Sequence, residues 1–260
     1  MDLDLAGRTA LVTGASRGLG RAIASVLAAE GCHLHLAATD AARLEALAAE
    51  LSGAPRSRVV THALDLSLTR NIEALGAACG DVDILINNAG AIPRGTLEEV
   101  DTATWRRAWD LKVFGYIDLT RLIYPRMCAR GKGVIINVVG MAGERAQFDY
   151  IATCTANAAL IMFTECLGGE SVRHGVRVVS INPGPIDSDR FRRGAQRAAE
   201  RELGDAGRWQ EIANRFPIGR PGRPEEVAYM AAFLASDRAA YISGEGVRID
   251  AGLRVRSPSH

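Results

Sequence analysis

The chain places Thr13-Gly14-Ala15-Ser16-Arg17-Gly18-Leu19-Gly20 directly after a short apolar run, residues 8–13, and before a longer Ala- and Leu-rich stretch. This order predicts a strand, a tight turn and a helix. Gly14 permits the turn, Gly18 lets the backbone approach a pyrophosphate, and Gly20 allows the helix to pack closely on the sheet. The free N–H groups and the positive end of the helix would then face the phosphates. The stretch therefore predicts a dinucleotide-binding turn.

Short β-branched runs alternate with longer helical stretches along the whole chain, which predicts a parallel sheet covered by helices on both faces. The expected strands are 8–13, 33–38, 58–64, 82–86, 133–139, 176–182 and 246–250. The expected helices are 18–30, 40–51, 68–79, 101–128, 150–173 and 224–236. Because there is no low-complexity linker and no fixed-period repeat, we expect a single α/β domain over 1–260. Its fold class would be a Rossmann-type, doubly wound, seven-stranded parallel sheet.

Composition narrows the class of protein. The net charge of +1 over 260 residues gives no electrostatic reason to expect a nucleic acid or an anionic membrane as partner. The five cysteines are odd in number and contain no C-x-x-C pair, which favours reduced thiols over disulfides or a zinc site. The N-terminus lacks a basic-then-apolar signal pattern, and we expect no apolar run that approaches the ~20 residues needed to span a bilayer. The histidines fall on expected strands, helix ends or the tail. We therefore expect a cytoplasmic protein without a metal site.

Several further motifs occur in a fixed order along the chain. They are Asn87-Asn88-Ala89-Gly90 after the fourth strand, Pro183-Gly184 after the sixth, Gly219-Arg220-Pro221-Gly222-Arg223-Pro224-Glu225-Glu226-Val227, Tyr241-Ile242-Ser243-Gly244 and Asp250-Ala251-Gly252. Together with the glycine turn, they resemble the short-chain dehydrogenase/reductase family over essentially the whole chain. The resemblance implies the strand order 3-2-1-4-5-6-7, the cofactor NAD(P) and a small carbonyl or alcohol substrate. It also implies a homodimer or homotetramer.

The resemblance also implies which residues surround the cofactor. They are Gly14, Ser16, Arg17, Gly18, Leu19, Gly20, Thr39, Asp65, Leu66, Asn87, Ala89, Gly90, Pro183, Gly184, Ile186 and Ser188. Asp65 and Leu66 would border the adenine, whereas Ile186 and Ser188 would hold the nicotinamide carboxamide.

The choice between NAD and NADP depends on the end of the second strand, where an acidic residue would bind the ribose 2′-hydroxyl and a basic one the 2′-phosphate. The family's acidic position holds Ala38 and its basic position holds Thr39. Asp40 is placed to cap the next helix. Arg17 can pair with a phosphate, so the sequence leans slightly to NADP.

The catalytic positions of the family are where this chain departs from it. By resemblance, a tyrosine exchanges a proton with the substrate, a lysine four residues on supplies a cation, a serine orients the substrate and an asparagine joins the proton relay. Flanking sequence places Thr153 at the tyrosine, Asn157 at the lysine, Gly140 at the serine and Lys112 at the asparagine. A rival placement puts Tyr150 at the tyrosine. Its fourth neighbour is then Cys154, and the serine position falls on Asn137.

Two residues keep an enzyme possible despite these replacements. Tyr150 lies three residues before Thr153, so it would share a helix face with it if the helix has begun. Lys112 would place a cation on the opposite wall of the site. Simpler interpretations also exist. Tyr150 could be an ordinary aromatic of an interface or of the pocket wall, and Lys112 could form a salt bridge with Asp110 or with a neighbouring loop. Asn157 could only satisfy backbone groups.

Three functions follow. The first is an NAD(P)-dependent oxidoreductase in which Lys112 and Tyr150 take over electrostatic and proton-transfer roles. The second is a catalytically degenerate cofactor-binding sensor or assembly protein. The third, a non-redox lyase or hydrolase, lacks a nucleophile–base pair.

The sequence leaves the role of two further segments open. Residues 187–223 are polar and Arg-rich and should form one or two helices outside the sheet. They are either a mobile substrate lid or a solvated element whose arginines pair with Glu200, Glu202, Asp205 and Glu211. Glu144 and Arg145 follow the fifth strand, where they either face the solvent or face the substrate.

Overall fold

The computed structural model describes residues 1–52 and 57–256. Seven strands form one parallel sheet in the order β3-β2-β1-β4-β5-β6-β7. Their bounds are β1 Thr9–Thr13, β2 His33–Ala38, β3 Val59–Ala63, β4 Ile84–Asn87, β5 Gly133–Val138, β6 Val176–Pro183 and β7 Gly246–Ile249. The predicted fold class and strand order are confirmed.

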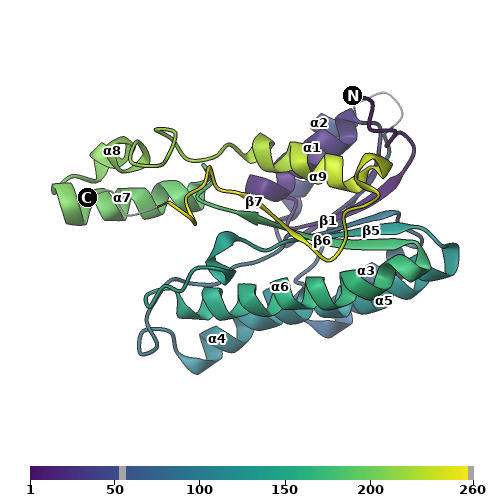
Figure 1. Cartoon of the computed structure of the whole chain (residues 1–260), viewed down its shortest axis with the longest axis horizontal. Helices are drawn as coiled ribbons and strands as arrows, with labels where there is room; N and C mark the ends of the chain where they lie inside the picture. Colours follow the sequence, from purple (N-terminus) through teal and green to yellow (C-terminus); the bar gives the residue numbers. More distant parts are fainter. Residues whose placement is uncertain (53–56, 257–260) are drawn as a thin grey trace.

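The helices cover both faces of the sheet, α1, α2 and α9 on one side and α3 to α6 on the other (Figure 1). Their bounds are α1 Gly18–Ala29, α2 Ala41–Leu51, α3 Thr69–Ala78, α4 Thr102–Trp109, α5 Gly115–Arg130, α6 Ile151–Ser171, α7 Asp189–Leu203, α8 Trp209–Ala213 and α9 Pro224–Ala235. Side chains alternate along a strand, so Val12 packs in the core cluster with Ile23 of α1 and Val227 of α9. Its neighbour Leu11 packs in the opposite cluster with Ile123 of α5.

The central strands are buried at every position, as parallel strands covered on both faces must be. This holds for all residues of β5 and β6. Their register pairs Ile135 with Val178 and Asn137 with Ser180. The burial explains why these strands are rich in Val and Ile, although they also bury the polar side chains of Asn137, Arg177, Ser180 and Asn182.

The single helix predicted over 101–128 is interrupted. The chain forms α4, then a π-helical turn η1 (Asp110–Phe114), then α5. π-turns are rare and have no compositional signal, so the sequence pattern did not reveal this one. The turn matters because it holds Lys112.

Helix α6 corrects one expectation. With its 3₁₀ extension η3 (Val172–His174) it is a 24-residue stretch long and apolar enough to cross a membrane by length and composition alone. The prediction that no such run exists is therefore wrong. Ala156, Leu160 and Thr164 of this helix are fully buried in the fold. We interpret α6 as a core helix of the α/β domain.

The Arg-rich segment forms α7, the short 3₁₀ turn η4 (Ala206–Arg208) and α8, which project beyond one end of the sheet (Figure 1). Some expected ion pairs are present, including Glu211 with Arg208 at 2.7 Å and Glu202 with Arg215. Glu200 and Asp205 instead accept hydrogen bonds from backbone N–H groups. Only part of the arginine charge is therefore neutralised within the segment.

Candidate active site

The glycine turn packs directly against the Asn87–Gly90 motif. A Cβ on Gly14, whose φ is +66°, would lie 2.9 Å from the Cα of Ala89, and a Cβ on Gly20 would lie 2.2 Å from the carbonyl oxygen of Gly14. The Asn88 Nδ2 donates to the carbonyls of Thr13 (3.0 Å) and Gly14 (3.3 Å). Because β1 and β4 are adjacent, the two loops meet at the edge where their strands end, which is where α/β sheets bind ligands.

The next part of the turn is open. Gly18 has a φ of +57°, and a Cβ there would meet no atom within 4 Å. Arg17 makes no side-chain cap to α1, and the first turn of α1 carries no acidic residue. Ser16 and Leu19 are half-buried on either side of these residues. Open space beside an uncapped helix N-terminus fits a pyrophosphate.

The residues expected around the adenosine lie on the surface beside this turn. Asp40 accepts a hydrogen bond from the N–H of Arg43 (3.1 Å) and pairs with its guanidinium (3.3 Å), so its predicted capping role is confirmed. Thr39 and Arg17 are exposed. The carboxylate of Asp65 is held by Ser67, at 2.9 Å from its N–H and 2.8 Å from its Oγ.

Three further residues expected to contact cofactor are buried or fixed by backbone bonds. Leu66 is buried. The buried Asn87 donates to Asn137 Oδ1 (2.9 Å) and Thr120 Oγ1 (3.2 Å). Gly184, which follows Pro183 at the end of β6, donates its N–H to the Ile249 carbonyl (2.9 Å).

The segment after β6 continues into α7. Ile186 is buried and forms an isolated β-bridge with Gly222. Ser188 caps α7 by accepting a hydrogen bond from the N–H of Phe191 (3.2 Å). Both residues therefore hold the start of α7 against the sheet edge.

Lys112 points from the π-turn toward the end of β5. Its Nζ donates to the carbonyls of Val139 (3.1 Å) and Val138 (3.3 Å) and lies 5.3 Å from the ring centroid of Tyr116. A Cβ on Gly90 would lie 3.0 Å from the Lys112 Cδ, so the side chain runs over the Asn87–Gly90 motif. Burial, together with the charge of Arg190, lowers the pKa of Lys112 to about 7. The side chain makes no ion pair within the described residues, so the salt bridge to Asp110 is absent there.

Gly140, Thr153 and Asn157 lie together beside that lysine. Asn157 Nδ2 donates to the Gly140 carbonyl (3.3 Å), and Lys112 binds the carbonyl of the preceding residue. Gly140 has a φ of +117°, which side chains rarely adopt. Thr153 Oγ1 and Asn157 Oδ1 are buried, and neither has a hydrogen-bond partner within residues 1–52 and 57–256. Unpaired buried polar atoms of this kind call for a ligand or a water.

Tyr150 lies just outside α6, at its N-cap, so the helix has not yet begun there. Its hydroxyl oxygen accepts a hydrogen bond from Nη2 of Arg190 (2.8 Å). The ring lies between two arginines, with Arg94 Cζ 5.5 Å and Arg190 Cζ 5.9 Å from its centroid. Arg190 also donates to the Ile92 carbonyl (2.6 Å) and so ties α7 to the loop after β4.

Glu144 is not exposed to solvent. Its side chain is 11% exposed and binds Arg248 (2.6 Å), Arg254 (2.9 Å) and Asn182 Nδ2 (2.8 Å). The two arginines follow 104 and 110 positions later, so no local pattern could have predicted these contacts.

Sequence reasoning also missed a possible metal-ligand group. His35, His62 and Cys79 come from β2, β3 and the end of α3, and their ligand atoms lie within 4.8 Å of one another. His35 Nδ1 and His62 Nε2 are 2.9 Å apart, a hydrogen-bond distance. Two nitrogens bound at about 2.0–2.1 Å to one tetrahedral ion would be farther apart, so a metal would have to separate the pair. Burial lowers the pKa of both histidines.

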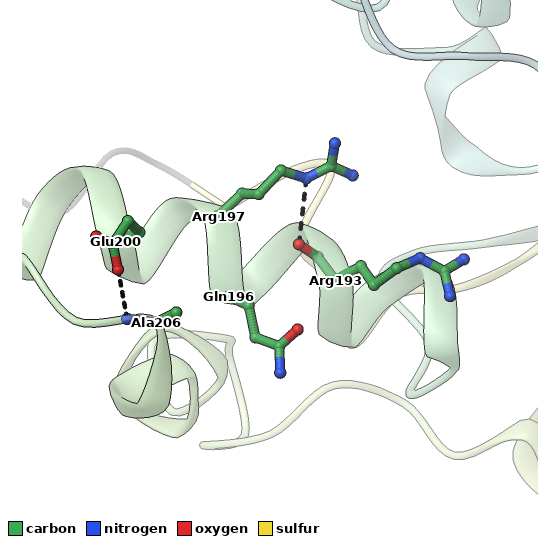
Figure 2. Close-up of a pocket in the computed structure, with 5 residues that line it drawn as sticks. All are labelled: Arg193, Gln196, Arg197, Glu200 and Ala206. Atoms are coloured by element: carbon green, nitrogen blue, oxygen red, sulfur yellow. Dashed lines mark hydrogen bonds between the residues drawn. The ribbon is translucent and has the colours of Figure 1, made fainter.

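An open hollow of about 600 Å³ lies along α7, lined by Arg193, Gln196, Arg197, Glu200 and Ala206 (Figure 2). It lies between α7 and the turn η4, in the part of the chain that projects beyond the sheet (Figure 1). We therefore exclude it from the candidate active site.

Comparison with known proteins agrees with this geometry. A family model described as short chain dehydrogenase matches residues 8–198. The chain belongs to the short-chain dehydrogenase family. The 2-keto-3-deoxy-L-fuconate dehydrogenase of Xanthomonas campestris pv. campestris is 33% identical over 252 residues, covering 95% of this chain and 80% of that protein.

Solved structures of the family superpose closely on this one. L-sorbose reductase from Gluconobacter frateurii, complexed with NADPH and L-sorbose, is 33% identical with a TM-score of 0.90, covering 96% of this chain and 98% of the other. A 7α-hydroxysteroid dehydrogenase complexed with NADH is 27% identical with a TM-score of 0.86, covering 96% of each chain. Such dehydrogenases and reductases act on small alcohol or keto substrates, which supports an oxidoreductase.

Proposed function

We propose that this chain is an NAD(P)-dependent oxidoreductase of a carbonyl/alcohol pair, in which Lys112 performs the proton transfer that the family assigns to a tyrosine. The observation that carries the proposal is the Lys112 amine, held at the end of β5 with a pKa of about 7. A general acid–base works best when its pKa lies near the working pH.

The cofactor-binding part of the proposal rests on the glycine turn. Open space at Gly18 and the uncapped start of α1 fit the pyrophosphate. Asn87 Oδ1 has no hydrogen-bond partner among the described residues and can accept a hydrogen bond. Gly14, Ser16, Arg17, Leu19, Gly20, Thr39, Asp65, Leu66, Ala89, Gly90, Pro183, Gly184, Ile186 and Ser188 would complete the binding surface. When bound, the reduced nicotinamide supplies the hydride for carbonyl reduction.

We favour NADP over NAD. Asp40 already pairs with Arg43, and Ala38 offers no carboxylate to a ribose 2′-hydroxyl. Arg17 is exposed and makes no ion pair within the described residues, so it is available to a 2′-phosphate. Among the related structures, both NADPH and NADH complexes occur.

The hydrogen bonds of Lys112 suit proton transfer in both directions. An ammonium has three N–H donors, and the carbonyls of Val138 and Val139 occupy two of them. In reduction, the third N–H would donate its proton to the substrate oxygen. The resulting neutral amine keeps both carbonyl bonds and has a lone pair that accepts a proton in the reverse reaction.

The other three replaced positions would hold the substrate. Thr153 Oγ1 and Asn157 Oδ1 each lack a partner within the described chain, so they are available to a substrate hydroxyl or a bridging water. Gly140 contributes its carbonyl to Asn157 and leaves space where the family has a serine side chain. We assign Tyr150 to the positioning of Arg190 rather than to proton transfer, because it lies before the start of the helix that carries Thr153 and Asn157 and its oxygen binds the guanidinium.

The remaining features of the proposal concern assembly and surroundings. The chain would act as one domain, with residues 187–223 as a substrate lid that Arg190 ties to the loop after β4. Exposed apolar side chains such as Phe114 and Met162 favour a homodimer or homotetramer. All five cysteines are free thiols, which favours the cytoplasm.

Two measurements on the purified protein test the function. NADPH and NADH binding is titrated first, by quenching of intrinsic fluorescence, and we expect NADPH to bind more tightly. The oxidation of each bound cofactor is then followed by loss of its absorbance with a panel of sugars, keto acids and cyclic ketones. Cofactor binding without turnover of any of them would favour a cofactor-binding sensor or assembly protein.

A further inference from the structure

Several acidic side chains around the candidate site are paired with arginine. The pairs are Asp149 with Arg94 (2.7 Å), Asp187 with Arg192 (2.8 Å), and Glu144 with Arg248 (2.6 Å) and Arg254 (2.9 Å). The last group carries one positive charge in excess. None of these carboxylates is left to bind a cationic or strongly polar ligand.

Two cations in the same region face only neutral acceptors. Arg190 binds the Ile92 carbonyl and the Tyr150 hydroxyl, and Lys112 binds two carbonyls. Neither makes an ion pair within the described residues. The charge of Arg190 contributes to the lowered pKa of Lys112, so the two cations are close enough to repel each other. No carboxylate raises that pKa.

Arg190 also has donors to spare. Both of its hydrogen bonds start from Nη2. A guanidinium has five N–H donors, so the three on Nε and Nη1 have no partner in the part of the chain that the structure describes. Arg190 is an exposed residue at the first turn of α7, so these donors are accessible to a ligand. A guanidinium with free donors binds carboxylates and phosphates most strongly.

We infer that the substrate is an anion, a hydroxy acid or keto acid whose carboxylate lies against the Arg190 guanidinium. This inference rests on the proposed function, since it places the reacting oxygen of the same molecule at Lys112. A carboxylate there would offset the two cations and keep α7 tied over the site. Arg190 would then determine substrate specificity, and Tyr150 and the Ile92 carbonyl would position it.

The test compares acids with their neutral analogues. The wild-type protein, Arg190→Met and Arg197→Met are assayed with NADPH against 2-keto acids and the corresponding methyl esters. Arg197 lies seven residues further along α7, beside the outer hollow, where its Nε donates to the Arg193 carbonyl (3.3 Å; Figure 2). Arg197→Met serves as the matched control because it removes the same charge from the same helix.

We expect Arg190→Met to lower kcat/KM for the acids about 100-fold more than for the esters, mainly through KM. Arg197→Met should change neither by more than about twofold. Equal losses in both variants would mean general attraction by the charge of the helix and would overturn the inference. Turnover of esters alone would also overturn it while leaving the proposed function intact.

A binding experiment keeps the inference testable without turnover. Thermal unfolding of the NADPH-bound protein is recorded with malonate and with neutral malonamide. Stabilisation by malonate in the wild type but not in Arg190→Met supports the anion site, even if no substrate is turned over. If Arg190→Met instead weakens NADPH binding and the malonate effect is absent, the guanidinium serves a cofactor phosphate, and the inference fails.

Discussion

The glycine turn after β1 and the strand end after β5 face the same edge of the sheet, but different groups fix them. The turn is built from backbone, and Gly14 and Gly20 leave no room for a Cβ. The strand end is built from side chains, with Lys112 and Asn157 bound to consecutive carbonyls of Val139 and Gly140. A backbone site tolerates few substitutions. A side-chain site can exchange residues while it keeps a cation and hydrogen bonds in place.

The largest effect should come from Lys112→Met. General acid–base groups contribute about 10²–10⁴-fold, so we expect turnover to fall at least 10³-fold while the Kd for NADPH stays within about twofold. Lys132→Met is the control, because Lys132 is the only other lysine and forms an exposed pair with Asp237 (3.4 Å). Comparable activity of the two variants would refute the assignment of Lys112.

Lys112→Met should also unfold less readily than the wild-type protein. The pKa of Lys112 is lowered from an ordinary 10.5 to about 7, so the folded state disfavours the ammonium that the unfolded chain carries at neutral pH. This cost grows as the pH falls from about 10 to 7 and is constant below. Lys112→Met should therefore raise the free energy of unfolding at pH 7 by about 1–3 kcal/mol, reduced by the water that reaches the site. Urea unfolding at pH 7 and pH 10 measures it.

Two glycines of the turn test the backbone side of the comparison. Gly20→Ala would bring a Cβ to 2.2 Å from the Gly14 carbonyl, and we expect a loss of about 3 kcal/mol or more in unfolding free energy. The Cβ of Gly18→Ala would meet open space, so this variant should lose only about 1–2 kcal/mol of unfolding free energy, because alanine must adopt a positive φ there. It should still weaken NADPH binding. Equal stability of the two variants would show that the close packing at Gly20 has been overstated.

The pH dependence of the rate separates an amine from a phenol. Reduction needs the Lys112 ammonium, so its rate should fall about tenfold per pH unit above about 7. Oxidation needs the neutral amine, so its rate should rise with pH up to about 7 and then level off. Stopped-flow rates of both directions between pH 5.5 and 9.5 would measure this. A reduction rate that stays level until about pH 10 would point to an unperturbed phenol instead.

The smallest effect should come from restoring the family serine. At Gly140 a side chain must adopt a φ of +117°, and its Cβ would lie 3.1 Å from Asn157 Nδ2. We expect Gly140→Ser to cost about 1–3 kcal/mol in stability and to give no gain in turnover. Gly169→Ser is the matched control, since a Cβ at this glycine of α6 meets nothing within 4 Å. A rise in kcat for Gly140→Ser would mean that the site has lost a function rather than changed it.

Local patterns predicted much of this molecule. Every expected strand forms within two residues of its predicted bounds, and Asp40 caps α2 as its side chain suggests. The π-turn at Asp110–Phe114 escaped prediction because its composition is that of an ordinary helix. The burial of Glu144 escaped because its arginine partners lie more than a hundred residues away.

The sequence by itself predicted the strands and the glycine turn, because periodicity and glycine spacing act over a few residues. The strand order was implied by the resemblance of its ordered motifs to a known family and is confirmed by the structure. Through the same resemblance the sequence predicted that Lys112, Thr153, Asn157 and Gly140 occupy the family's catalytic positions. Only the tertiary structure showed how Lys112 and Arg190 are held and which groups surround them. Burial and the Arg190 guanidinium of α7 lower the lysine's pKa, and the two carbonyls that hold its Nζ lie at the end of β5. Desolvation and charge depend on distance in space, which the order of residues along the chain does not give.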